Sequence, residues 1–168
     1  SRSINNPHII NGLPKDKPLF LLIWTTTPWT LLANVAVAVH HSYLYSFVDI
    51  GDEILIIESS LKENALTKGG IGKAKTIKEL KGEQLKELTY VHPFHLRENC
   101  PVVVVDYVTR EEGTGLVHTA PGHGQEDYET GLKYHLEVMM PVDHQGVFTQ
   151  EAGDFAGEHV FKANEKII

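Results

Sequence analysis

The sequence predicts a mixed α+β domain, mostly β, in which short strands close or nearly close into a barrel decorated by a few helices. Three observations support this fold class. The expected strands outnumber the expected helices, turn residues separate them at short intervals, and no sustained strand–helix alternation predicts a doubly wound sheet. The length of 168 residues allows one domain with a substantial core and leaves little room for a second.

The first strands are expected between a polar start and residue 58. Residues 1–17 are irregular and predict a loop that leads into the fold, and the opening Ser-Arg-Ser is interpreted as the edge of an excised piece. The continuously apolar run 18–24 predicts a buried strand. Three further strands, two of them flanking a Gly-Asp turn, predict an antiparallel meander over residues 34–40, 42–50 and 53–58.

Two helices are expected in the remainder. Ser60 and Glu63 have the spacing of a capping box, which predicts a helix from there to about residue 67. Acidic residues in a first turn predict a second helix over residues 125–136, because they complement the helix dipole. Residues 101–108 form the clearest buried strand, and residues 138–168 predict short strands joined by turns.

The stretch WTTTPWT, which begins at Trp24, is the first unusual feature. Its three β-branched threonines favour extended backbone, and the proline after Thr27 disfavours the helical region there. Side chains alternate along a strand, so Thr25 and Thr27 face one way and Thr26 the other. Their hydroxyls would form a polar ledge between Trp24 and Trp29. Alternatively, the threonines only reflect β-propensity on an exposed strand. The two flanking tryptophans count against this alternative, because indole side chains are seldom left exposed.

The stretch GTGLVHTAPGHGQEDY at residues 113–128 is the second unusual feature. A short apolar strand delivers His118 at its end, a Pro- and Gly-rich corner follows, and Asp127 lies in the first turn of the expected helix. Together these elements can grip a small polar group. The structural alternative stays open at this point, since first-turn acids usually cap their helix and a histidine at a strand end is usually a satisfied structural residue.

Charge and cysteine content limit the possible partners. The net charge of −7 argues against a protein that holds a long nucleic-acid backbone. Residues 62–86 carry seven lysines against three glutamates, a local balance of +4, which predicts a solvated surface more readily than an RNA-facing patch. No apolar run reaches membrane-spanning length, and the single cysteine, Cys100, excludes an internal disulfide and fits a reducing cytoplasm.

Several kinds of chemistry lack their motifs. There is no Gly-x-Ser-x-Gly elbow, Cys100 has no supporting motif as a nucleophile, and the glycines before Lys73 lack the rest of a phosphate loop. His118, His123 and Asp127 have spacings of five and four across a Pro-Gly corner, unlike a helical metal motif. What remains is a set of hydroxyls, a histidine and a carboxylate, which can orient a water and bind an ammonium group without a covalent intermediate.

With both stretches in hand, a family resemblance becomes specific. WTTTPWTLLAN at residues 24–34 together with GTGLVHTAPGHGQEDY at residues 113–128 resembles the editing domain of isoleucyl-tRNA synthetase. GEHVFKAN at residues 157–164 resembles that domain's return to the catalytic body. Leucyl and valyl relatives carry Thr-Thr-Arg-Pro where this chain has Thr27 before the proline, which favours the isoleucyl type. Leu32 stands where many relatives have proline.

The resemblance implies a distorted closed β-barrel of about six strands with flanking helices. Residues 1–168 would be a single editing domain excised from a larger synthetase, with residues 158–168 as its exit segment. Its activity would be aminoacyl-ester hydrolysis within isoleucine–tRNA ligase, an ATP-binding enzyme of the cytoplasm. The substrates would be valine mischarged on isoleucine tRNA and valyl-adenylate. The implied partners are the tRNA 3′ end carrying valine and the rest of the synthetase, with no cofactor, metal or membrane, and we expect a monomer.

By position, the resemblance also implies residue roles. Asp127 would bind the substrate α-amino group, His118 would border the valine side chain and exclude isoleucine, and Trp24 would form a wall. The ester, the terminal ribose and the attacking water would be positioned by Thr25, Thr26, Thr27, Thr30 and Asn34. A pocket made for isoleucine rejects the smaller valine only weakly, and the isoleucine–valine pair is the standard illustration of why a second, hydrolytic site is needed.

Two other classes of function remain as alternatives at this stage. A module that binds a tRNA 3′ end or a small amino-acid ligand without hydrolysing it would carry the same threonine ledge and the same carboxylate. In a purely structural β domain, both motifs would be present without any chemical role. Release of free valine from charged tRNA separates the hydrolase from both.

Overall fold

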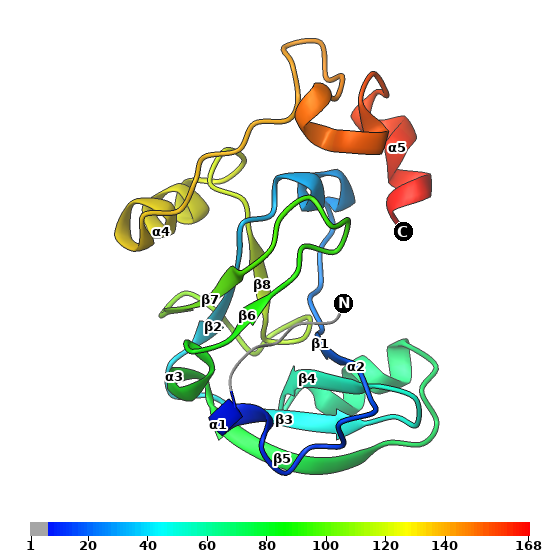
Figure 1. Ribbon diagram of the computed structural model, residues 1–168, viewed down its shortest axis with the longest axis vertical. Helices are drawn as coiled ribbons and strands as arrows, with labels where there is room; N and C mark the ends of the chain where they lie inside the picture. The colour runs from blue at the N-terminus through cyan, green and yellow to red at the C-terminus, as the bar shows by residue number, and fades with distance from the viewer. Residues whose placement is uncertain (1–6) are drawn as a thin grey trace.

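The computed structural model describes residues 7–168, in which two four-stranded mixed sheets lie next to each other and helices lie at both ends (Figure 1). The mixed α+β class is therefore confirmed. The Ser-Arg-Ser opening and residues 1–6 of the expected leading loop lie outside the described residues. The helices are α1 (Pro7–Ile10), η1 (Pro28–Ala33), α2 (Lys62–Lys68), α3 (Gly82–Leu85), α4 (Gln125–Tyr134), η2 (Gln150–Phe155) and α5 (Val160–Ile167), of which η1 and η2 are 3-10 helices.

The first sheet has the strand order β1-β4-β3-β5. Its strands are β1 (Leu19–Leu21), β3 (Leu44–Asp49), β4 (Ile54–Glu58) and β5 (Lys75–Lys81). The antiparallel pairing of β3 with β4 confirms the second half of the expected meander, whereas β1 joins β4 in parallel. The apolar run expected as a strand over residues 18–24 forms a strand over only three residues, and residues 22–25 have no regular secondary structure before the bend at Thr26.

The second sheet has the strand order β6-β7-β2-β8 and carries one of the two unusual stretches. Its strands are β2 (Ala36–His40), β6 (Thr89–Tyr90), β7 (Cys100–Val105) and β8 (Val117–Thr119). β2 runs parallel to β7 and antiparallel to β8. Both faces of β2 are buried, since its valines and its alanines pack into two different apolar clusters. This central position fixes β8, and with it His118, on the edge of the sheet.

The closed barrel of about six strands is not confirmed. Within residues 7–168 no strand pairing joins the two sheets, and β1 and β6 remain their outer strands. These strands have three and two residues, and apolar side chains from both line a pocket between them. The sheets are held together by a shared apolar core that includes Val37, Val39, Tyr45, Phe47, Ile56, Tyr90 and Leu116.

The expected capping box at Ser60 is wrong. Helix α2 begins after Leu61 without a side-chain capping bond. The Glu58 carboxylate, which is 1% exposed, accepts instead from the backbone N–H groups of Ser60 at 2.9 Å and Leu61 at 3.1 Å. Arg110 Nε lies 3.0 Å from its other oxygen. A buried carboxylate with these partners is satisfied, and because the Ser60 hydroxyl also donates to it, that side chain does not cap the helix.

The turn before β8 is fixed against β4 by close backbone contact. Gly115 has a φ of +73°, and a Cβ there would lie 2.2 Å from the Glu58 Cβ, so only glycine fits. The Tyr45 hydroxyl donates to the Gly115 carbonyl at 2.8 Å, and the Glu58 N–H donates to the Thr114 carbonyl at 2.9 Å. The first glycines of the second unusual stretch therefore serve packing, and they set where β8 begins.

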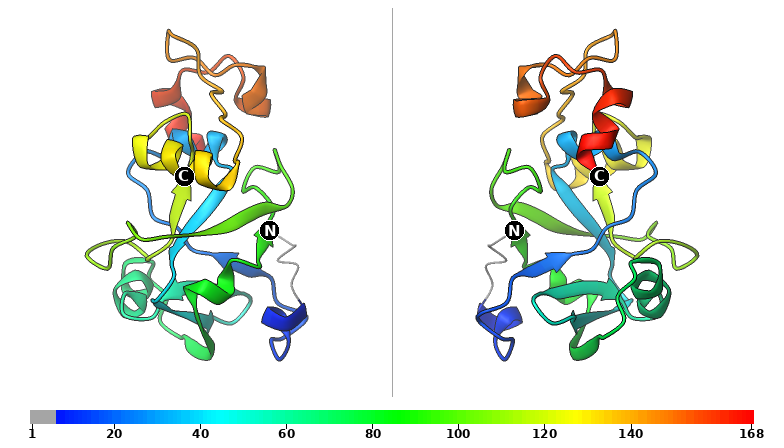
Figure 2. Two further views of the ribbon diagram at one scale, coloured as in Figure 1. Left: turned by 90° about the vertical axis from the view of Figure 1, so that its left-hand side faces the viewer. Right: turned by 90° about the vertical axis from the view of Figure 1, so that its right-hand side faces the viewer.

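The C-terminal segment differs from the expected series of short strands. It contains only two isolated bridges, Val142–Phe148 and Val147–His159, together with η2 and α5. Figure 2 shows this segment, coloured orange and red, as one end of the molecule. Apolar side chains of α5 pack with Leu32 of η1, so the segment supports the helix that follows the threonines. Within residues 7–168 no helix is long and apolar enough to cross a membrane.

Candidate functional site

The threonine stretch forms a turn that leads into η1. The backbone N–H of Thr27 donates to Thr25 Oγ1 at 3.0 Å, and the Thr30 N–H donates to the Thr27 carbonyl at 3.1 Å. Pro28 takes the first helical position, where its missing N–H leaves no bond unmade. Thr25 and Thr27 are half-buried and Thr26 is exposed, which agrees with the expected alternation.

The second stretch places a histidine and a carboxylate beside this turn. His118 lies on β8 opposite Val37 of β2. Asp127 lies in the first turn of α4, yet its carboxylate does not cap that helix. Asp127 Oδ2 accepts from the backbone N–H of Ala120 at 2.9 Å and so ties the Pro-Gly corner to the helix. This bond leaves acceptor capacity on the carboxylate for a ligand.

The two stretches converge on one pocket of about 360 Å³. Seven of the expected site residues line it: Trp24, Thr25, Thr26, Thr27, Thr30, His118 and Asp127. The remaining lining residues are Trp29, Val117, Ala120 and His123. Threonine hydroxyls, two imidazoles and one carboxylate therefore border the same pocket.

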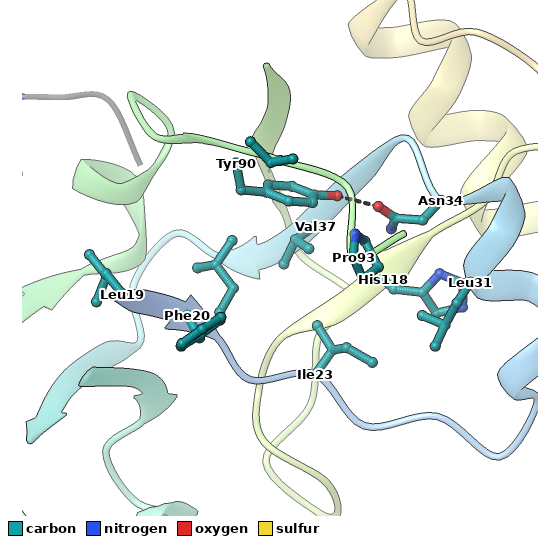
Figure 3. A pocket seen from close by; sticks show the side chains of 11 residues that line it. Leu19, Phe20, Ile23, Leu31, Asn34, Val37, Tyr90, Pro93 and His118 are labelled. Atoms are coloured by element: carbon teal, nitrogen blue, oxygen red, sulfur yellow. Dashed lines mark hydrogen bonds between the residues drawn. The ribbon is translucent and has the colours of Figure 1, made fainter. Parts of the chain in front are cut away.

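Asn34 does not join this pocket. Its side chain is 2% exposed, its amide donates to the Ala36 carbonyl at 2.9 Å, and its oxygen accepts from the Tyr90 hydroxyl. Asn34 instead lines a second, mostly apolar pocket, drawn in Figure 3 with the Asn34–Tyr90 hydrogen bond dashed. Leu32 is fully buried and continues η1. The end of η1 is therefore held in place by Asn34 and Leu32, on the side away from the polar pocket.

Burial governs the charges of the polar pocket. It lowers the pKa of His118 to about 4, with a smaller contribution from His123, whose own pKa burial also lowers. Both imidazoles are therefore neutral at pH 7. Burial raises the pKa of Asp127, and the Ala120 N–H opposes that change. A cation beside Asp127 would favour its ionised form further, so the pocket suits an ammonium group.

Two contributors to the site were not among the predicted site residues. His123 was considered only as a metal ligand, yet its ring meets Trp29 edge-on with centroids 5.0 Å apart. Lys68 Nζ, on α2, lies 5.8 Å from the centroid of the Trp24 ring, and Trp24 lines the pocket. The lysine-rich composition of residues 62–86 was the available signal for Lys68, but composition alone does not say which lysine faces the site.

One group of side chains outside the pocket has the composition of a metal site. His40, His41 and Asp106 bring their ligand atoms within 4.8 Å of one another at the adjacent ends of β2 and β7. The two imidazoles are stacked, with centroids 4.5 Å apart and planes 25° apart, and His40 Nδ1 lies 3.1 Å from Ser42 Oγ. His41 Nδ1 lies 3.1 Å from the Asp106 carboxylate, a contact that accounts for the cluster without an ion.

Comparison with known proteins gives concordant results. A family model described as "Leucyl-tRNA synthetase, editing domain" matches residues 15–163. The isoleucine–tRNA ligase of Petrotoga mobilis is 52% identical over 149 residues, which cover 89% of this chain and 16% of that protein. The isoleucine–tRNA ligase of Methanothermobacter thermautotrophicus is 45% identical over 169 residues, covering 97% and 16%. The chain thus spans about one sixth of the length of these curated relatives.

Solved structures with low sequence identity share the fold. The crystal structure described as GlLeuRS-CP1 superposes with a TM-score of 0.77 at 19% identity, covering 97% of this chain and 87% of that one. The editing domain of the Plasmodium falciparum cytosolic leucyl-tRNA synthetase gives a TM-score of 0.73 at 12% identity, covering 91% and 76%. The chain that carries these two polar stretches and their pocket is thus similar in sequence and in fold to synthetase editing domains.

Proposed function

This chain belongs to the family of aminoacyl-tRNA synthetase editing domains, and from that premise we propose that it hydrolyses valine mischarged on isoleucine tRNA. Valyl-adenylate is proposed as a second substrate of the same site. The curated relatives named isoleucine–tRNA ligase support the isoleucyl type over the leucyl type. The observation that carries the proposal is the convergence of the threonine turn, His118 and Asp127 on one pocket.

Substrate binding begins at Asp127. Its half-buried carboxylate is oriented by the Ala120 N–H, which leaves its remaining lone pairs for the α-ammonium group. Neutral His118 forms the part of the wall that the valine side chain would meet, and its bulk would exclude the extra methylene of isoleucine. Trp24, which is 48% exposed, would cover the mouth as an aromatic wall.

Hydrolysis then needs an oriented water and no covalent intermediate. The hydroxyls of Thr25, Thr26 and Thr27 line the pocket and can each donate and accept, so we assign them the ester, the terminal ribose and the attacking water. A water held close to the ester carbonyl carbon gains rate from that orientation. Its oxygen would bond this carbon, the bond from the carbon to the ribose oxygen would break, and the ribose oxygen would take up a proton from the water. Asn34, whose amide nitrogen and oxygen are each hydrogen-bonded, would contribute by fixing the junction of η1 and β2 rather than by touching the substrate.

The proposed domain organisation follows from the length of the relatives. Residues 1–168 would form one editing domain within a longer synthetase, and residues 158–168, which include α5, would lead back to its body. The partners would be the tRNA 3′ end carrying valine and the catalytic and anticodon-binding parts of the enzyme. We propose a cytoplasmic setting, and for the isolated chain a monomer.

Single-turnover deacylation tests the proposal. Isoleucine tRNA charged with radiolabelled valine is mixed with excess protein, and free valine is followed against time, with the isoleucyl ester and a protein-free reaction in parallel. We expect valine release well above the protein-free rate and much slower release of isoleucine. Tight binding of the charged tRNA with no release above the protein-free rate would support the non-hydrolytic binding module instead.

A further inference from the structure

The hydrogen bonds of Thr30 determine where the His118 proton lies. Thr30 Oγ1 lies 2.7 Å from the Thr27 carbonyl, which can only accept, so the single hydroxyl proton is donated there. His118 Nε2 lies 3.0 Å from the same oxygen and must therefore be the donor in that contact. Because burial keeps the ring neutral at pH 7, its only ring proton is on Nε2. Nδ1 is then a bare acceptor, and this buried atom has no partner among residues 7–168.

Thr30 is consequently the only described residue whose side chain hydrogen-bonds the His118 ring. The threonine itself is firmly placed, since it is 7% exposed and its N–H is bonded within η1. His118 lines two pockets, the polar one and a second one. It borders the second pocket, of about 220 Å³, between β1, the segment after β6 and η1 (Figure 3). An apolar cavity of about 150 Å³ suffices to hold benzene, so this pocket has room for an imidazole ring.

We propose that Thr30 is a positioning residue for substrate selection: its hydroxyl holds the His118 ring at the wall of the polar pocket, against withdrawal into the apolar pocket behind it. This inference rests on the proposed function. With the hydroxyl present, withdrawal would break the Nε2–Thr30 contact and move the proton into a pocket whose polar side chains, Asn34 and Tyr90, already bond each other, which is unfavourable. Without the Thr30 hydroxyl, the Nε2 proton loses this partner at the wall of the polar pocket as well. The side-chain hydrogen bond that favours the ring position at that wall is then gone.

The test compares three substitutions at and behind the ring. Thr30→Val keeps the shape and removes the hydroxyl, and we expect the ratio of isoleucyl to valyl ester hydrolysis to rise about tenfold or more, the discrimination that one methylene is worth. Thr30→Ser restores a hydroxyl and should return the ratio close to that of the unmodified chain. Ile23→Phe, added to Thr30→Val, fills the apolar pocket and should also lower the ratio. Thr114→Val removes another buried threonine hydroxyl, away from both pockets, and should leave the ratio unchanged.

A second readout does not depend on activity. Nitrogen-15 shifts of the His118 imidazole at pH 7 should report a proton on Nε2 in the unmodified chain and a changed environment in Thr30→Val. A proton on Nδ1 would overturn the proposal even if Thr30→Val fails to fold. So would a folded Thr30→Val with unchanged discrimination, or one that loses hydrolysis of both esters equally. An unmodified chain that hydrolyses neither ester overturns the proposed function and the selection role with it, while the nitrogen shifts still report on the Thr30–His118 contact.

Discussion

Replacing Asp127 by asparagine separates a structural carboxylate from one that binds a substrate cation. In the structure Asp127 accepts one hydrogen bond, from the Ala120 N–H, and the asparagine oxygen can accept the same bond. A charge-assisted bond exceeds a neutral one by roughly 1 kcal/mol. Burial disfavours the charged form and raises the pKa of Asp127, so part of even this loss is offset. For a chain of this length ~1 kcal/mol corresponds to a melting shift of about 2–4 °C.

The catalytic loss should be much larger than the structural one. An ammonium group facing an amide loses its charge partner and meets an N–H donor that repels it. We expect Asp127→Asn to lower valyl-tRNA hydrolysis at least ~100-fold, which is about 2.7 kcal/mol of transition-state binding. The two assays are a thermal melt and single-turnover deacylation on the same preparation.

The neighbouring residue provides a matched control. Glu126 lies in the same first turn of α4, is exposed and does not line the pocket, so Glu126→Gln removes the same charge from the same helix. Hydrolysis by Glu126→Gln should stay near normal. Near-normal hydrolysis by a folded Asp127→Asn, or equal losses in the two variants, would reduce Asp127 to a tether for the Pro-Gly corner and refute the assignment.

Four further predictions follow from the same contacts. His118→Ala should gain hydrolysis of correctly charged isoleucyl-tRNA, and unchanged discrimination would assign size exclusion to other residues. His92 is fully buried, is hydrogen-bonded as a neutral ring and has a pKa of about 4, against 6.5 in the unfolded chain. Its contribution to stability is therefore complete above pH 6.5 and is lost as the pH falls toward 4. In urea unfolding, the stability of His92→Gln should depend less on pH over that window. Gly115→Ala should destabilise the fold by about 2 kcal/mol or more, because a Cβ would overlap Glu58, and a small shift in the denaturation midpoint would contradict the packing. Valyl-tRNA hydrolysis should weaken as salt rises and Lys68→Ala should reduce the slope, whereas a flat response would remove the lysines from RNA recruitment.

The local features of the fold were predictable from the sequence because they depend on short-range patterns. The extent of α4, the strand at β7 and the alternation of Thr25 and Thr27 follow from periodicity and turn residues. The error at Ser60 has a long-range cause. The Glu58 carboxylate that accepts from the Ser60 side chain is buried by a turn more than fifty residues away, at Gly115, and no pattern near Ser60 reveals it.

The site was predictable to the extent that its residues lie in two contiguous stretches. Asn34 belongs to the first stretch but faces the apolar pocket, because its amide is engaged by Tyr90 of a strand that the sequence did not place beside it. Barrel closure was likewise beyond the local pattern, since it depends on whether the short strands β1 and β6 approach each other. The two stretches predicted most of the side chains that line the polar pocket, whereas the partition into two pockets required the tertiary structure.

A crystal structure with a non-hydrolysable valyl-adenosine analogue tests most directly whether the substrate binds beside Asp127. The chain offers two adjacent pockets, and we assign the substrate to the polar one. We predict that the analogue's ammonium group lies within hydrogen-bonding distance of the Asp127 carboxylate, at about 2.7–2.9 Å, with the valine side chain against His118. An analogue seated in the apolar pocket beside Asn34 and Tyr90, or one that makes no contact with Asp127, would contradict the account.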